Sequence, residues 1–362
     1  MDTIIKPEYP LSIQELLIRA VEKEASDLHL VVARAPSFRI SGALLQEDLP
    51  QLTTVTMKKL LYEILTIEQQ EKLERDWELD FSYAIPGCSR FRGNIIYQRG
   101  TLAAAFRVVP FDIPLLENLT NNPDIYRLCT LTRGLVLVTG PTGSGKSTLL
   151  AGMIDRINRT SDVNVITIED PIEFLHFHKR SMIRQREVGT DTHSFSAALR
   201  QALRHDPDVI MIGEMRDYES IAIALTAAET GHLVFSTLHT QNAPLSINRI
   251  IDSFPDGSRA QIRQQVAGSL RAIISRQLIP STDGKRVAAD EYMVDTNAVR
   301  SMIREGNELQ IYSAIQTGKD QYMQTMDQSL AALYNAGKIT YENMIQHCIN
   351  VKEVQRLTKN MF

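Results

Sequence analysis

The sequence predicts an α/β protein in two parts, an α+β domain over residues 1–109 and an α/β domain with a C-terminal helical layer over residues 124–362. In the first part, apolar and polar residues alternate between Leu79 and Ile85, with the period of half-buried antiparallel strands. In the second part, apolar runs alternate with segments of helical period, which favours a parallel sheet covered by helices. Three prolines within residues 110–123 predict an interdomain linker.

A glycine-rich loop follows the first apolar run of the second part. The run Leu135–Val138 is typical of a buried strand, and after it Gly140-Pro-Thr-Gly-Ser-Gly-Lys-Ser147 matches the G-x-x-x-x-G-K-[ST] pattern of phosphate loops. In such loops backbone N–H groups converge on phosphate oxygens, the lysine reaches the β- and γ-phosphates, and the hydroxyl can bind Mg²⁺. A glycine turn that merely precedes a helix is the alternative, and the lysine, the hydroxyl and the preceding strand disfavour it. We therefore predict an ATP and Mg²⁺ site that comprises Gly140, Pro141, Thr142, Gly143, Ser144, Gly145, Lys146, Ser147 and Thr148.

Composition limits the other function classes. A net charge of -4 provides no overall positive field for nucleic acid or anionic lipid, and no clustered basic stripe with aromatic residues is present. The three cysteines, Cys88, Cys129 and Cys348, are far apart and form no C-x-x-C pair, which argues against a disulfide framework and a structural zinc site. No apolar run approaches the ~20 residues of a membrane span. We expect a cytoplasmic protein with no membrane span and no nucleic-acid partner.

Carboxylates follow two of the predicted strands. Glu169-Asp-Pro-Ile-Glu173 lies at the end of the strand 163–168, where open α/β sheets bind ligands. We predict Glu173 as the general base that polarises the attacking water, and a solvated acidic turn is the alternative. The next strand, Val209–Ile212, is followed by Gly213 and Glu214, in a Walker-B-like arrangement in which glycine stands where aspartate is usual. We expect Glu214 to engage Mg²⁺, directly or through water, together with Ser147.

The remaining segments complete a RecA-like or related architecture. His232 and His239 stand at the two ends of another apolar strand, and each is either a structural residue or a phosphate sensor. Five later segments have helical composition and predict the C-terminal helical layer: 242–253, 260–277, 296–304, 326–336 and 341–350.

Arginines are frequent in the strands of the first part. Arg90, Arg92, Arg99 and Arg107 lie in a domain that has no phosphate loop of its own. They either keep the surface soluble or reach a nucleotide that a neighbouring domain or subunit holds, because a guanidinium group suits γ-phosphate oxygens.

Together these motifs resemble the PilT family of type IV pilus retraction ATPases, within the secretion-ATPase superfamily. The resemblance runs nearly end to end and rests on short segments in a specific order: 25–30, 90–92, 140–147, 168–174, 185–189, 208–217 and 226–240. It implies a PAS-like N-terminal domain, a RecA-like ATPase domain, and a homohexamer that couples ATP hydrolysis to pilus disassembly and twitching motility. It also implies an inner-membrane platform protein as partner, the pilin fibre as an indirect partner, and a location at the cytoplasmic face of that membrane.

The resemblance also implies roles for individual residues. Glu173 corresponds to the catalytic glutamate, Glu214 to the Mg²⁺-associated residue, and His232 and His239 to the histidine-box residues, with His239 in catalysis and His232 at the nucleotide. Arg92, Arg99 and Arg107 correspond to arginines that approach nucleotide, and we expect Arg92 and Arg107 to act in catalysis.

Two features of the sequence favour retraction over extension. The tetracysteine zinc insertion of the extension ATPases is absent, and Ala298–Glu305 is similar to the Ala-Ile-Arg-Asn-Leu-Ile-Arg-Glu signature of the retraction proteins. The alternatives are a secretion or conjugation ATPase of the same superfamily and a nucleotide-switched assembly factor.

Overall fold

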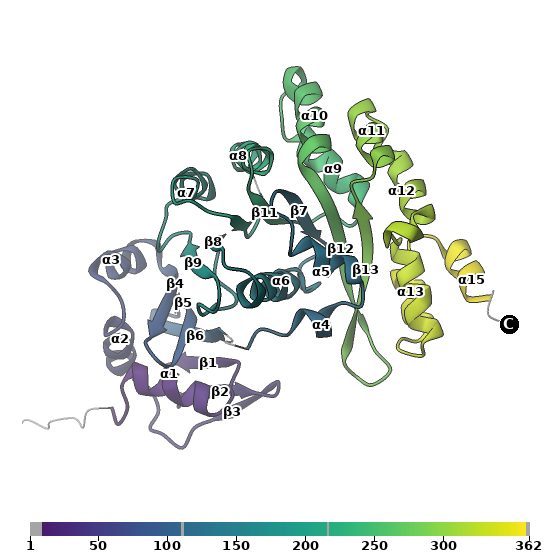
Figure 1. The fold of residues 1–362 in the computed structure, drawn as a ribbon. Helices are drawn as coiled ribbons and strands as arrows, with labels where there is room; N and C mark the ends of the chain where they lie inside the picture. Colours follow the sequence, from purple (N-terminus) through teal and green to yellow (C-terminus); the bar gives the residue numbers. More distant parts are fainter. Residues whose placement is uncertain (1–8, 110–111, 216, 360–362) are drawn as a thin grey trace, which may run out of the picture. The chain divides into compact units, whose positions relative to one another are not determined.

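The computed structural model describes residues 9–109, 112–215 and 217–359. The chain divides into two compact units, of which the first is Met1–Asp112 with Pro171–Leu175 and the second is Ile113–Asp170 with His176–Phe362 (Figure 1). Residues 110–111 of the predicted linker lie outside the described residues, and a short helix, Leu116–Leu119, occupies part of the rest.

The first unit is an antiparallel sheet with helices, in agreement with the predicted α+β organisation. Its six strands follow the order β3-β2-β1-β6-β5-β4. The helix α1 begins with a capping box between Ser12 and Glu15 and buries an apolar stripe against the sheet. The elements are α1 Ile13–Glu22, β1 Asp27–Val31, β2 Ser37–Ile40, β3 Ala43–Gln46, α2 Thr54–Tyr62, α3 Ile67–Asp76, β4 Glu78–Ile85, β5 Ser89–Gln98 and β6 Thr101–Val109.

The second unit contains a seven-stranded sheet in the order β13-β12-β7-β11-β10-β8-β9. All neighbouring strands are parallel except β12 and β13, which form an antiparallel pair at one edge. The strands are β7 Gly134–Thr139, β8 Asn164–Glu169, β9 Met182–Glu187, β10 Val209–Ile212, β11 Leu233–Leu238, β12 Leu270–Pro280 and β13 Arg286–Val294.

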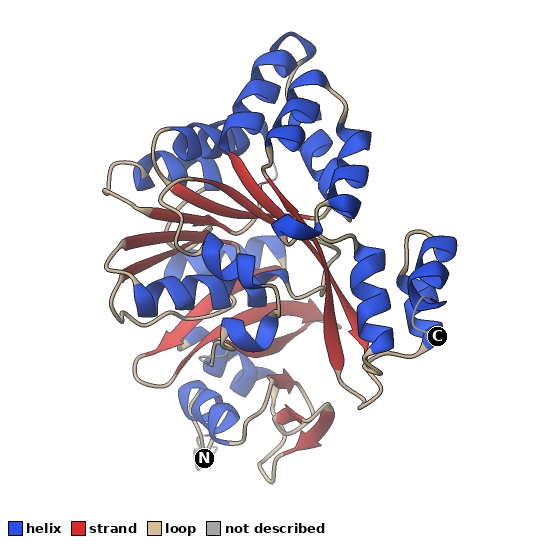
Figure 2. Ribbon diagram, turned by 45° about the vertical axis from the view of Figure 1, so that its right-hand side comes forward, coloured by secondary structure: helices blue, strands red, loops and turns tan. Residues whose placement is uncertain are grey.

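Helices cover both faces of this sheet, and Figure 1 shows α6 on the opposite face from α7 and α8. The helix α13 packs against β13, and α9 packs against β12 and β13 (Figure 2). The helices are α4 Leu116–Leu119, α5 Pro123–Leu128, α6 Lys146–Thr160, α7 Phe195–Ala202, α8 Tyr218–Glu229, α9 Ala243–Asp252, α10 Arg259–Ser269, α11 Asn297–Glu305, α12 Glu308–Thr317, α13 Met326–Asn335, α14 Tyr341–His347 and α15 Val351–Lys359. Across the part of the chain that the structure describes, no helix combines the length and the apolar composition that a membrane crossing requires.

The prediction of a helix over residues 260–277 is wrong in its second half. The helix α10 ends at Ser269, and Leu270 begins β12, which pairs with β7. Six of the first seven residues of β12 are buried, four of them apolar and the other two Ser275 and Arg276, so burial does not alternate along the strand. A fully covered strand has no period of two, and its sequence cannot be told from that of a buried helix by spacing alone.

The segment Ala298–Glu305 lies in α11. Val299 and Ile303 are buried on one face of the helix. On the other side Arg304 is exposed, whereas Arg300 is half-buried and pairs with Asp295 at 2.5 Å. Arg300 therefore contributes to the fold of the helical layer.

Candidate nucleotide site

The phosphate loop lies at the carboxyl end of a central strand. All six residues of β7 are buried between β11 and β12, and α6 begins at Lys146. No side chain caps the amino terminus of α6, and Gly145 adopts the left-handed conformation there with φ 84°. The first N–H groups of a fifteen-residue helix are therefore available to an anion.

Glycine is required at the first position of the loop. A Cβ atom at Gly140 would lie 2.3 Å from the carbonyl oxygen of Arg276 and 2.7 Å from the hydroxyl of Ser144, and φ is +140°. Because Arg276 belongs to β12, that strand forms one wall of the loop. The sequence did not predict this wall, since it placed residues 260–277 in a helix.

The side chain of Lys146 contacts the backbone of its own loop. Its Nζ donates hydrogen bonds to the carbonyl oxygens of Gly140 at 2.8 Å and Pro141 at 2.9 Å, and the residue is 8% exposed. Ser147 and Thr148 are half-buried in the first turn of α6, and Pro141, Thr142 and Gly143 are exposed. The lysine, the hydroxyls and the uncapped helix terminus form a donor set that fits a nucleotide triphosphate with Mg²⁺.

Glu214 and His239 lie together at the same edge of the sheet as the loop. The parallel register pairs Leu238 with Thr139, so the residues that follow β11 and β7 leave the sheet side by side. The Nε2 atom of His239 lies 3.2 Å from the Oε1 atom of Glu214. Their side chains are 48% and 21% exposed, respectively, so the pair lines an accessible edge.

Close packing against β8 explains why glycine occupies position 213 in the Walker-B-like segment. A Cβ atom at Gly213 would lie 3.3 Å from the carbonyl oxygen of Ile168 and 3.4 Å from the Cα atom of Glu169. The end of β10 therefore passes close to the end of β8, and an aspartate side chain at this position would crowd that strand. The carboxylate is carried one residue later, by Glu214.

The acidic segment after β8 separates into buried and exposed residues. Glu169 is 7% exposed and accepts hydrogen bonds from the Thr167 hydroxyl at 2.6 Å and the Gln185 amide at 3.0 Å. Glu173 is exposed and belongs to the segment Pro171–Leu175, which groups with the first unit. The structure therefore favours Glu173 over Glu169 as a group that can reach water.

His232 is not brought to the phosphate loop of its own chain. Its carbonyl oxygen accepts the N–H of Gly134, which begins β7, whereas the loop follows the end of that strand. Six residues of β11 separate His232 from His239, which corresponds to about 20 Å of strand. The ring Nδ1 of His232 lies 3.0 Å from the carbonyl oxygen of Ala227, a local contact.

The structure brings two of the three predicted arginines of the first unit together. Arg92 on β5 and Arg107 on β6 are directly opposite each other, so their side chains share one face of the sheet. Both are exposed, and Arg107 Nε donates to Asp27 Oδ1 at 3.0 Å. Arg99 lies in the turn that joins the two strands, about 23 Å along β5 from Arg92.

A family model described as "Type II/IV secretion system protein" matches residues 112–356. The "Type IV pilus retractation ATPase PilT" of Pseudomonas aeruginosa is 47% identical over 333 residues, which cover 92% of this chain and 97% of that protein. The chain belongs to the PilT family of type IV pilus retraction ATPases. Membership in the PilT family makes the chain an ATP-hydrolysing enzyme and confirms the resemblance predicted from the motifs.

A solved structure and a second relative agree with this family. A crystal structure described as the pilus retraction motor PilT with bound ADP has a TM-score of 0.88 and 47% identity, and the match covers 96% of this chain and 99% of that one. A "Twitching motility protein" of Neisseria gonorrhoeae is 46% identical over 308 residues, 85% of this chain and 82% of that protein. The fold match confirms the predicted secretion-ATPase architecture.

Proposed function

We propose that this chain is the motor that retracts a type IV pilus, with ATP hydrolysed at the loop 140–148. The observation that carries the proposal is the phosphate loop, within a chain that aligns along 97% of a pilus retraction ATPase. A secretion ATPase is supported less well, because the type II secretion protein E of Xanthomonas campestris is 30% identical and only 51% of its length is covered. The work would be done as a homohexamer on an inner-membrane platform protein, in the cytoplasm at the face of that membrane.

In this proposal the loop holds the triphosphate and Mg²⁺. Lys146 would exchange its two carbonyl contacts for phosphate oxygens, and the Ser147 hydroxyl and Glu214 would hold Mg²⁺, which supplies charge neutralisation at the phosphates. Among the described residues no group of three or more His, Cys, Asp or Glu side chains could hold a metal by itself. That composition suits Mg²⁺, which is commonly held by one or two protein ligands together with phosphates and water.

The remaining site residues complete the proposal. Glu173 would accept a proton from the attacking water, and His239 would orient Glu214 through their 3.2 Å contact. Arg92 and Arg107 would approach the nucleotide of a neighbouring chain as one pair, since they share a face of the first unit. Arg99 is a weaker candidate because it lies at the far end of the same hairpin, and we infer no contact between His232 and the nucleotide of its own chain.

A site shared between chains predicts a specific result in subunit mixing. Arg107→Ala and Lys146→Ala should each abolish turnover alone, because an arginine that completes a phosphoryl-transfer site contributes on the order of 10³ to 10⁵ in rate. Mixed oligomers should regain part of the activity, because some sites then combine an intact arginine with an intact loop. Phosphate release at a series of mixing ratios measures this.

The control for the mixing experiment is Arg99→Ala, which alters an arginine of the same hairpin. Arg99→Ala is expected to lose much less activity than Arg107→Ala. If intact mixed oligomers regain no activity at any ratio, the arginines do not act between chains.

A further inference from the structure

The side chain of Gln185 forms hydrogen bonds to both ends of the loop that carries Glu173. The Gln185 amide on β9 donates from Nε2 to Glu169 Oε1 at 3.0 Å and accepts the His176 N–H at Oε1 at 2.8 Å. Glu169 is the last residue of β8, and His176 is the residue at which the chain re-enters the second unit. Gln185 therefore closes residues 170–175 into a loop with defined ends.

A second set of contacts holds the residues after His176 on α6, the helix that begins at the phosphate loop. Asn158 is fully buried, and its side-chain amide donates to the Phe177 carbonyl at 2.6 Å and accepts the Lys179 N–H at 3.0 Å. Both polar atoms of the Asn158 side chain are thus used on this one segment. Asn158 lies twelve residues after Lys146, or about 18 Å along α6.

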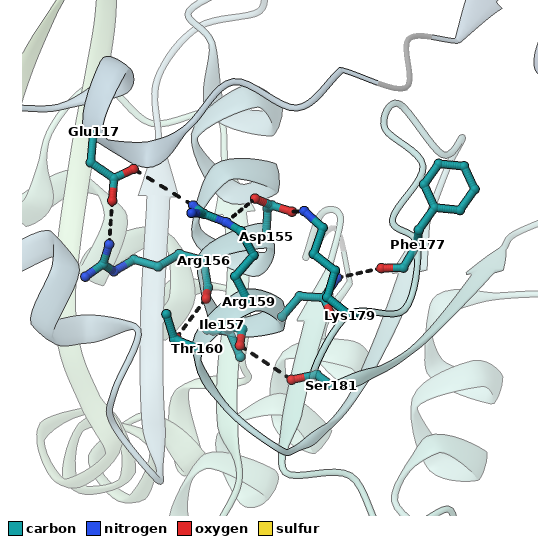
Figure 3. Close-up of polar contacts among 10 residues, drawn as sticks. Glu117, Asp155, Arg156, Ile157, Arg159, Thr160, Phe177, Lys179 and Ser181 are labelled. Carbon is teal, nitrogen blue, oxygen red and sulfur yellow. Dashed lines mark hydrogen bonds and ion pairs between the residues drawn. The ribbon is translucent and has the colours of Figure 1, made fainter.

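An ion pair strengthens the same attachment. Lys179 Nζ lies 2.5 Å from Asp155 Oδ1, and Arg159 Nε lies 2.8 Å from Asp155 Oδ2 (Figure 3). Asp155 is 4% exposed, and a buried carboxylate is stable only when cations or hydrogen bonds compensate it. Burial lowers the pKa of the nearby His176 to about 4, so at neutral pH that ring adds no charge beside Lys179.

The cluster also reaches α4, through Arg156 and Arg159 of α6. Glu117 of α4 pairs with Arg156 at 2.5 Å, and its other oxygen lies 3.9 Å from Arg159 (Figure 3). The chain enters the second unit at Ile113, three residues before α4 begins. Both segments by which the chain enters the second unit, at Ile113 and at His176, are therefore attached to the helix that carries the phosphate loop.

We propose that Gln185 and the Lys179–Asp155 pair are positioning residues for Glu173. They hold the residues on either side of its loop to β9 and α6, so both ends of the loop are fixed within the second unit. The proposal rests on the proposed role of Glu173 as the base. Displacement of a reacting group by about 1 Å can cost on the order of 100-fold in rate, so loosening these ends should lower kcat without weakening nucleotide binding.

The test compares three single variants, Gln185→Met, Lys179→Met and Arg180→Met. Arg180 is the matched control, because it neighbours Lys179 and its side chain pairs with the exposed Asp162. Gln185→Met and Lys179→Met should lower kcat by about 10- to 100-fold, with the Kd for ADP within about twofold of wild type. Arg180→Met should match wild type in both. Melting temperature and titration with ADP give the fraction of folded, binding-competent sites, and rates are expressed per competent site.

The effect must also depend on Glu173. In a Glu173→Gln background, adding Lys179→Met should change the residual single-turnover rate by less than about twofold, because no base remains to be misplaced. A purely structural role would instead lower the rate in both backgrounds by the same factor and would overturn the inference. If Gln185→Met and Lys179→Met both keep the wild-type kcat while Glu173→Gln is inactive, the positioning inference is overturned and the proposed role of Glu173 as the base stands. Wild-type turnover in Glu173→Gln would overturn the proposed base and the inference together.

Discussion

Lys146→Ala is expected to weaken ATP binding by about 10²- to 10⁴-fold and to leave no measurable turnover. The Nζ atom has two acceptors on the loop and would donate instead to two phosphate groups of bound ATP. Hydrogen bonds to charged groups contribute about 1.5–3 kcal/mol each, and about 1.4 kcal/mol corresponds to tenfold in affinity. Filter binding of ATP beside phosphate release measures both quantities.

The control for this variant is Lys338→Ala, which removes an exposed lysine from the turn after α13. It should bind and hydrolyse ATP as wild type does. ATP binding by Lys146→Ala within about threefold of wild type would show that the loop is not the triphosphate site.

Glu173→Gln is expected to keep ATP bound and to lower turnover by about 10²- to 10⁴-fold, the range that general-base catalysis contributes. The amide keeps the size of the side chain but cannot accept a proton from water. Glu214→Gln should also bind ATP and fail in turnover, because it removes the carboxylate beside His239. The same two assays separate this pattern from that of Lys146→Ala.

Glu342→Gln serves as the control for the loss of one carboxylate, since Glu342 is exposed in the first turn of α14. Its turnover should equal wild type. If Glu173→Gln turns over at the wild-type rate, another group activates the water.

The parts of the site that the sequence could predict are those carried by local patterns. The phosphate loop follows from spacing, and the meeting of Glu214 and His239 follows from parallel strands whose carboxyl ends share one edge. The pairing of Arg92 with Arg107 also follows from the chain alone, because a two-residue turn at Arg99 and Gly100 places them opposite each other.

Other parts depend on contacts between distant residues. The Thr139 hydroxyl at the end of β7 donates to Ser275 of β12 at 2.9 Å, across 136 positions of sequence, and no local pattern indicates this pairing. The sequence places His232 and His239 on either side of one strand, but the length of β11 puts them at its opposite ends, so only His239 lies at the carboxyl end. Gln185 begins the segment 185–189 that carries the resemblance, but the sequence indicates no role for it, and only the structure shows that both ends of the 170–175 loop bond to its side chain.

The central claim is that ATP hydrolysis at the loop 140–148 drives pilus retraction, and counting surface pili and twitching in a deletion strain tests it most directly. Loss of this chain should leave cells with more surface pili and without twitching motility. The wild-type chain should restore both, whereas Lys146→Ala and Glu173→Gln, at equal protein level, should restore neither. Unchanged or fewer surface pili in the deletion strain, or full rescue by either variant, would contradict the account.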